Sequence, residues 1–334
     1  MIWKPALSYV SWCMDQSENS QRQWVKILKL PMLIFTPIVA FIAPLGIFVV
    51  FAVVFVGIEQ SIYPEHEVSD RLISNTANEL TLNEKGALLF DAATIQLDKE
   101  LRSTLGWCPN DVFLDWLDNR CERQIGVHYA TRESLKILSV YTTKFGLGDV
   151  ENQDTLSARE IIAYKVDVWA LMGIFPGSSE STYKKSLKSV NKFIDTAKQS
   201  SDLVVNIRTD DLKAILDSIK NDVLQEPFGQ LTSRNNNVNW FELDNKVYFA
   251  QGAAIVARDI LVVMRNRFES ELEKGGLENL DAAIDSLNAA AQFNPWLVAR
   301  GDGDSMWADH RSKMARYFSE AFRRIEEVSG SLRI

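Results

Sequence analysis

The feature that most constrains this chain of 334 residues is an uncharged apolar stretch, residues 30–58, in which Thr36 is the only polar side chain. A helix rises about 1.5 Å per residue and the hydrocarbon layer of a bilayer is about 30 Å thick, so roughly 20 apolar residues span it once. Two passes would need about 40 residues and a turn. The stretch therefore predicts one transmembrane anchor that contacts membrane lipid, with the span itself near residues 38–58.

The charged residues on either side of this anchor predict its orientation. Arg22, Lys26 and Lys29 precede it, whereas the charged residues after it are acidic as far as Asp70. Basic residues stay on the cytoplasmic side. A cleaved signal peptide also begins with basic residues, but its apolar region is only about 7–15 residues long and ends at a small-residue cleavage site. We therefore expect residues 1–29 to be a cytoplasmic tail, amphipathic or poorly ordered, and residues 59–334 to lie outside the cytoplasm.

The charge balance excludes one class of partner. The formal net charge is −8, and residues 1–29 contain four basic and two acidic side chains, so the rest of the chain carries −10. An acidic surface repels the phosphates of nucleic acids. We expect no nucleic-acid partner.

The exterior part shows helical spacing of its apolar side chains, and strand-like alternation is almost absent. Capping boxes at Thr81 and Ser157, each followed three residues later by Glu, predict two helix starts. Pro176 with Gly177, and Pro227 with Gly229, are expected to end helices. Apolar stripes and caps predict helices over residues 83–104, 127–145, 161–172, 187–197, 212–223, 247–272, 280–292 and 305–328.

These elements predict an all-α fold in which one N-terminal transmembrane helix is followed by a multi-helix domain. Short connections favour antiparallel packing of consecutive helices. The polar, turn-rich residues 231–239 are the best internal boundary. They predict a first helical subdomain over residues 59–230 and a second over residues 240–334 that packs on the first.

The three cysteines are expected in different compartments. Cys13 lies on the predicted cytoplasmic side, whereas Cys108 and Cys121 lie outside and bracket a 14-residue segment. In an oxidising compartment these two could form a disulfide, although two separately buried thiols fit the spacing as well. His66 and His128, like the third histidine, make no ligand-spaced pair with another His or Cys, so no metal site and no cofactor are predicted.

Few residues suggest catalysis. Asp111, Asp115 and Asp118 have the spacing of one helical face, where carboxylates could act as general acid, base or metal ligands. Acidic residues after Pro109 are also what the start of a helix favours without any catalytic role. His310 falls on the apolar stripe of the last predicted helix, where a buried structural histidine and a titrating one are both possible. We predict no catalytic site, and Asp111, Asp115 and His310 are the only candidates.

One group of residues resembles a known family pattern. Residues 106–111 and 117–127 are similar to the GW-x-PND and LDN…Q-[LI]-GV motifs of the bacterial membrane family catalogued as domain of unknown function 2333, found in gamma-proteobacteria. The resemblance extends over nearly the whole chain. Cys108 replaces an ordinary polar residue of the pattern, and Gln251 replaces an Arg. The motif positions present here are Gly106, Trp107, Pro109, Asn110, Asp111, Asp118, Asn119 and Gly126.

The resemblance implies an inner-membrane protein with an exterior helical domain, and it implies no reaction. Together with the orientation predicted from the flanking charges, it predicts a cytoplasmic N-terminus and a periplasmic helical domain. We expect a protein that binds or scaffolds another envelope protein, rather than an enzyme, because no catalytic triad, metal set or phosphate loop is present in the sequence. The alternative is an envelope hydrolase that acts on cell-wall or lipid-linked material through residues 111–118.

Overall fold

The computed structural model describes residues 46–47, 50, 66–73, 80–103, 105–110, 118–140, 152–168, 177–200, 205, 207–233, 240–272, 276–293, 295 and 309–332. The chain divides into two compact units, Met1–Ser61 and Ile62–Ile334. In the first unit, Gly46, Ile47 and Val50 are helical. The predicted cytoplasmic tail and the rest of the predicted anchor lie outside the described residues.

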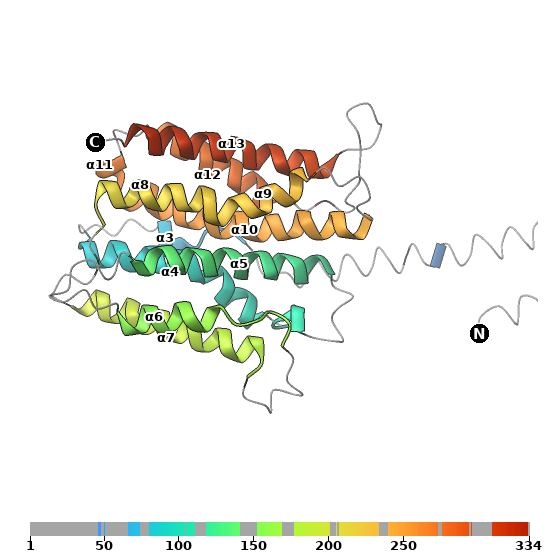
Figure 1. Cartoon of the computed structure of the whole chain (residues 1–334), viewed down its shortest axis with the longest axis horizontal. Coiled ribbons are helices and arrows are strands. Elements are labelled where there is room, and N and C mark those ends of the chain that lie inside the picture. Colours follow the sequence, from blue (N-terminus) through green and yellow to red (C-terminus); the bar gives the residue numbers. More distant parts are fainter. Residues whose placement is uncertain are drawn as a thin grey trace, which may run out of the picture. The chain divides into compact units, whose positions relative to one another are not determined.

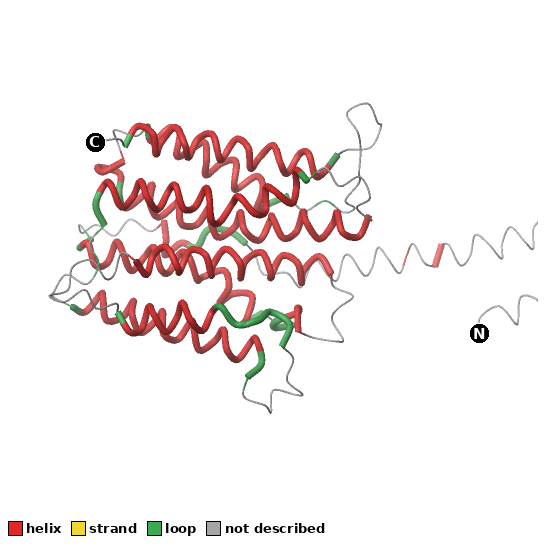
Figure 2. The backbone as a smooth tube through the Cα atoms, viewed as in Figure 1, coloured by secondary structure: helices red, strands yellow, loops and turns green. Residues whose placement is uncertain are grey.

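The second unit is helical, and its described part contains no strand (Figures 1 and 2). The predicted all-α fold is therefore confirmed for these residues. The elements are α3 (Asp70–Ile73), α4 (Leu82–Arg102), the 3-10 turn η1 (Cys108–Asn110), α5 (Asp118–Val140), α6 (Gln153–Ile162), α7 (Ser179–Gln199), α8 (Thr209–Ser218), the π-helix η3 (Ile219–Leu224), α9 (Gln225–Thr232), α10 (Trp240–Arg267), α11 (Glu269–Leu272), α12 (Leu277–Ala291) and α13 (His310–Ser331).

Helix α10 is the centre of this unit and packs against α4, α5, α9 and α12. In Figure 1, α12 and α13 lie on one side of it, and α6 and α7 lie beyond α4 and α5 on the other. Within the described part of the chain, Leu243–Arg267 is the one helix long and apolar enough to cross a membrane, with a mean hydropathy of 1.6. Its most apolar window is completely buried by neighbouring helices, as expected for the core helix of a bundle.

Two glycines let α5 and α10 touch backbone to backbone. A Cβ on Gly126 would lie 2.0 Å from the carbonyl oxygen of Phe249, and a Cβ on Gly252 would lie 2.1 Å from that of Arg123. Only glycine permits such an approach. Helix α10 follows residues 231–239 and packs on α4 and α5, which precede them, within the unit Ile62–Ile334. The predicted division into two helical subdomains at residues 231–239 stays a prediction.

Of the two helix starts predicted from capping boxes, one is confirmed and the other is wrong. Thr81 and Glu84 form the predicted capping box of α4. The predicted start at Ser157 is wrong, because α6 begins at Gln153 and the side chain of Asn152 accepts hydrogen bonds from the N–H groups of Asp154 and Thr155. Asn152 caps a helix as well as a hydroxyl residue does.

Pro227 and Gly229 do not end a helix, contrary to the prediction. Both lie within α9, which follows the π-helix η3 without a break. The wider π turn shifts the hydrogen-bonding register. Pro227 is the third residue of α9 and directly follows this π turn.

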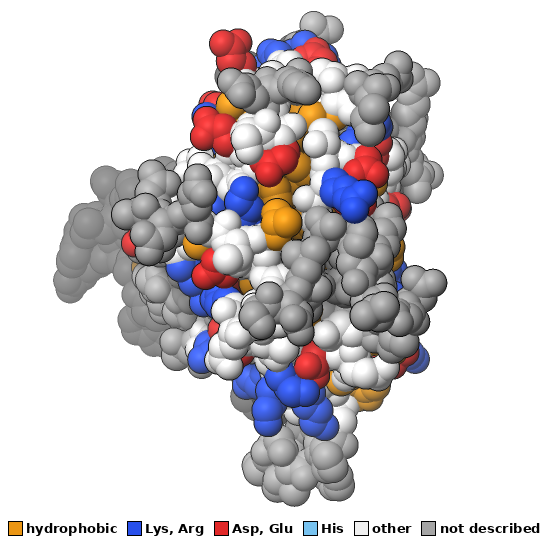
Figure 3. Space-filling view, turned by 90° about the vertical axis from the view of Figure 1, so that its left-hand side faces the viewer, with side chains coloured by type: hydrophobic (Ala, Val, Ile, Leu, Met, Phe, Trp, Pro, Cys, Tyr) orange, Lys and Arg blue, Asp and Glu red, His pale blue; other side chains and the backbone are white. Residues whose placement is uncertain are grey.

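The surface of the second unit is mixed in charge. Figure 3 shows one end of the bundle, where basic and acidic side chains lie around a small apolar area. In the described part of this unit, the large hydrophobic side chains that are exposed are Ile73, Leu82, Val140 and Tyr164.

Candidate functional site

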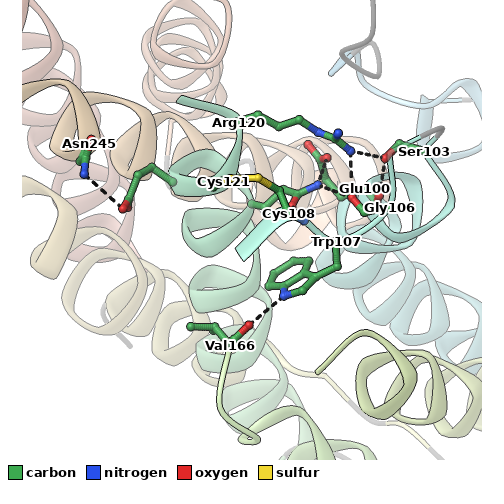
Figure 4. Close-up of a disulfide and its surroundings, with 11 residues drawn as sticks. Glu100, Ser103, Gly106, Trp107, Cys108, Arg120, Cys121, Val166 and Asn245 are labelled. Atoms are coloured by element: carbon green, nitrogen blue, oxygen red, sulfur yellow. Dashed lines mark hydrogen bonds between the residues drawn. A yellow bond between two sulfur atoms is a disulfide. The ribbon is translucent and has the colours of Figure 1, made fainter. Parts of the chain in front are cut away.

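The family-motif residues gather where the segment before η1 meets the start of α5. The structure joins Cys108 and Cys121 in a disulfide, with their Cα atoms 5.1 Å apart (Figure 4). Both cysteines are buried, with 1% and 8% of their surface exposed. The disulfide therefore ties the motif segment to α5 in the interior.

Two side chains of α5 form hydrogen bonds with the motif segment that precedes η1. Arg120 donates to Ser103 Oγ (2.5 Å) and to the carbonyl oxygen of Gly106 (2.9 Å). Gln124 accepts a hydrogen bond from the N–H of Cys108 (2.8 Å) and donates to the same Gly106 oxygen (3.0 Å). Gly106 has φ 63°, a left-handed conformation that glycine adopts without strain. The motif thus builds a rigid turn.

The same motif region supports a second irregular segment, residues 162–168, which we call the presented loop. It begins at the last residue of α6, where the sequence predicted a continuing helix. Side chains from η1, α5, α7 and the motif segment lie within 3.0 Å of five of its carbonyl oxygens. The pairs are His128 Nε2 with Ile162, Tyr183 Oη with Tyr164, Ser179 Oγ with Lys165, Trp107 Nε1 with Val166 and Asn110 Nδ2 with Val168.

An aromatic cluster forms the base of the presented loop. The ring of Tyr183 lies 4.4 Å from that of His128 and 5.2 Å from that of Trp107, measured between centroids. Burial lowers the pKa of His128 to about 4 and raises that of Tyr183, so both are neutral at pH 7. The outer side of the loop remains exposed at Tyr164, Lys165 and Asp167.

The predicted catalytic candidates are not brought together among the described residues. Asp111 and Asp115 lie outside those residues, as does the side chain of Asp118. His310 is the first residue of α13, which begins five residues later than predicted, and it lies about one turn before the buried Met314. Its ring lies 5.7 Å from that of Phe293, and burial lowers its pKa. Within the described ranges, no group of three or more His, Cys, Asp or Glu could hold a metal ion.

The remaining described motif residues lie in η1 and α5. Pro109 and Asn110 belong to η1, Asn119 lies in the first turn of α5, and Gly126 makes the close contact with α10. Gln251, at a position where the resemblance predicted Arg, donates to the carbonyl oxygens of Ala291 and Phe293, both at 2.9 Å. It therefore satisfies carbonyl groups at the end of α12.

A buried polar network that sequence reasoning missed lies beside the motif. Glu100 of α4 is completely buried and accepts a hydrogen bond from Gln124 (2.8 Å). Its Oε1 lies 3.3 Å from His66 Nε2 and 3.5 Å from Arg123 Nη2. Burial raises the pKa of Glu100, but Arg123, His66 and Gln124 together outweigh it and lower the pKa to about 2. Glu100 is therefore ionised at neutral pH.

The network continues into α10. Arg258 and Asp259 form a buried ion pair at 2.8 Å. Arg258 also donates to Asn288 of α12 (3.0 Å) and to the carbonyl oxygen of His66 (2.6 Å), while Gln96 of α4 donates to Asp259. One sequence signal could have revealed this network, since Gln96 and Glu100 fall on the same helical face as the apolar residues of α4.

An open surface pocket lies between α5, η3, α9 and α10. Its volume is about 560 Å³. Tyr129 donates to the carbonyl oxygen of Asp222 (2.7 Å), and burial raises its pKa to about 12, so it remains a donor. The lining is polar and aromatic, and it contains no histidine or cysteine: Tyr129, Arg132, Glu133, Asn221, Asp222, Gln225, Glu226, Gln230 and Phe249.

Comparisons with known proteins place the chain in a family without a known activity. No curated protein and no solved structure matches it. The family model described as "Uncharacterized protein conserved in bacteria (DUF2333)" matches residues 35–234, which is more than half of the chain. This range contains the motif turn, the presented loop and the π-helix. The chain therefore belongs to this family of uncharacterised bacterial proteins.

Proposed function

We propose that this protein is a membrane-anchored helical component of the bacterial envelope that binds another envelope protein through the presented loop. One observation carries the proposal. Five carbonyl groups of an irregular surface segment are fixed by side chains beneath it, and two of those side chains, Trp107 and Asn110, belong to the family motif.

A rigid loop on a helical scaffold is suited to binding. Binding residues often lie on loops that a rigid framework positions. Because the backbone of residues 162–168 is already fixed, little conformational entropy is lost when a partner docks on it. Its exposed side chains, Tyr164, Lys165 and Asp167, combine an aromatic ring with both charges, a mixture typical of protein contacts.

The proposed location is the periplasmic side of the inner membrane, with residues 30–58 as the anchor. The basic residues before that stretch support a cytoplasmic N-terminus. The Cys108–Cys121 disulfide supports an oxidising compartment for the bundle.

The residues that could perform chemistry favour binding over catalysis. His128 is buried and His66 is partly buried, and their ring nitrogens face structural partners. The pocket near η3 is lined by no histidine or cysteine. The envelope hydrolase remains a prediction from the sequence, carried by Asp111 and Asp115.

Site-specific photocrosslinking in native membranes tests the proposal. A benzophenone amino acid in place of Tyr164 should give one reproducible adduct, and the same group in place of Glu326, an exposed residue of α13, should not. Trp107→Phe keeps the aromatic ring but removes the donor to Val166, so it should reduce the adduct. Equal adducts at both positions, or an adduct that Trp107→Phe leaves unchanged, would contradict binding through the presented loop.

A further inference from the structure

The first described residues of the second unit, 66–73, cross the bundle as a strap. Charged side chains of the bundle hold three of its residues. Lys99 Nζ donates to the carbonyl oxygen of Glu67 (3.2 Å), Asp91 pairs with Arg71 (2.8 Å), and Arg267 donates to the carbonyl oxygen of Leu72 (3.4 Å). The side chain of Leu72 is completely buried. We call residues 66–73 the His66 strap.

His66, the first residue of this strap, contacts the polar network formed by α4 and α10. Its backbone carbonyl accepts a hydrogen bond from Arg258 (2.6 Å), and its ring nitrogens face Glu100 (3.3 Å) and Gln96 (3.5 Å) of α4. The charged groups around it are Glu100 and Lys99 from α4, Arg123 from α5, and the Arg258–Asp259 pair from α10.

The arrangement favours a neutral imidazole. The oxygen of Glu100 that faces His66 Nε2 also faces Arg123 at 3.5 Å, so a protonated His66 would place a second cation against a carboxylate that already has one. Burial and Arg123 lower the pKa of His66, while Glu100 and Gln96 raise it by less. A strap lifted from the bundle would return His66 to water and to its ordinary affinity for a proton.

We propose that the His66 strap is released by acid, through protonation of His66 against the Glu100–Arg123 pair. The closed strap binds fewer protons than the open one, so opening becomes more favourable as pH falls below about 6.5 and stops changing once the closed form is also protonated. The proposal holds whether or not the presented loop binds a partner.

Release would lengthen the link between the bundle and the anchor proposed above. From residue 58 to residue 66 the chain can span at most about 27 Å, whereas from residue 58 to the start of α4 at residue 82 it can span about 80 Å.

Hydrogen exchange of the full-length protein in detergent tests the proposal. After correction for the intrinsic exchange rate, protection of residues 66–73 should fall by up to about tenfold per pH unit between pH 6.5 and 5, because opening takes up one proton. Peptides from α4 and α10 should stay protected over the same range. Unchanged protection of the strap, or loss of protection in α4 and α10 together with it, would overturn the proposal.

Matched variants assign the effect to one side chain. His66→Gln cannot titrate and should abolish the pH dependence of strap protection, whereas His310→Gln, at a histidine on α13, should retain it. Asp91→Asn tests a further titratable group that faces the strap, the partner of Arg71, and should also retain the pH dependence. The same pH dependence in His66→Gln as in the natural protein would rule out His66 as the trigger.

Discussion

At the scale of single residues, the buried ionic groups have the largest energetic consequences. Removing one partner of a buried ion pair typically costs 3–5 kcal/mol, because the other charge stays buried without compensation. Glu100 compensates Arg123 in the centre of the bundle. We predict that Glu100→Gln lowers the free energy of unfolding by about 3–5 kcal/mol, measured by chemical denaturation of the solubilised full chain. Glu67→Gln, at an exposed position, is the matched control and should change little.

The pH dependence of the same denaturation provides a second readout for Glu100. Its pKa in the folded protein is lowered to about 2, below the ordinary value of 4.5, so its contribution is complete above pH 4.5 and is lost as pH falls toward 2. The natural protein should therefore lose stability between pH 5 and 3, and Glu100→Gln should lose less. An identical decline in both would show that Glu100 is not the group that titrates.

The disulfide gives a separate prediction at this scale. It closes a 14-residue segment, for which the chain-entropy model gives about 3 kcal/mol. We expect Cys108→Ser with Cys121→Ser to be less stable than the natural protein by about that amount, measured by thermal and chemical denaturation. Reducing agent should destabilise the natural protein and leave the double variant unaffected, and Cys13→Ser should behave like the natural protein. A natural protein that is insensitive to reducing agent would indicate that the bond is absent.

At the scale of elements, the contact between α5 and α10 determines the packing. Gly126→Ala and Gly252→Ala would each force a Cβ to within about 2 Å of a backbone oxygen that cannot move without shifting a helix. We predict that each costs about 3 kcal/mol or more. Gly229→Ala is the control, because nothing lies within 4 Å of its added Cβ, and it should stabilise α9 by about 0.5–1 kcal/mol. Denaturation midpoints of the three variants measure these effects.

The elements also show where sequence reasoning succeeds and where it cannot. Local signals were sufficient for the cap at Thr81 and for the apolar stripes of α7, α10 and α12, because these depend on residues a few positions apart. The end of α6 at residue 162 depends on Trp107, His128 and Tyr183, which are distant in sequence and meet only in the folded bundle. The motif residues could be recognised because they are close together in the sequence. Their support of the presented loop could not be predicted, because the loop is distant from them in the sequence.

At the scale of the whole molecule, two segments could be the membrane element, residues 30–58 and helix α10. A charged side chain near the centre of a bilayer is costly, and Arg258 and Asp259 lie within α10. Their partners come from α4, α12 and the strap, so α10 is built to be surrounded by protein. This reasoning supports the proposal that residues 30–58, rather than α10, contact the membrane.

Deletion of residues 1–61 separates the two possibilities, because it removes the first compact unit and leaves the second intact. If residues 30–58 are the anchor, the shortened protein should fractionate with soluble proteins, keep its helical circular dichroism and unfold cooperatively. The buried surface of α10 supports this outcome, since its apolar side chains are already covered by α4, α5, α9 and α12. A folded protein that still requires detergent would instead identify α10, or another part of residues 62–334, as a membrane-contacting element.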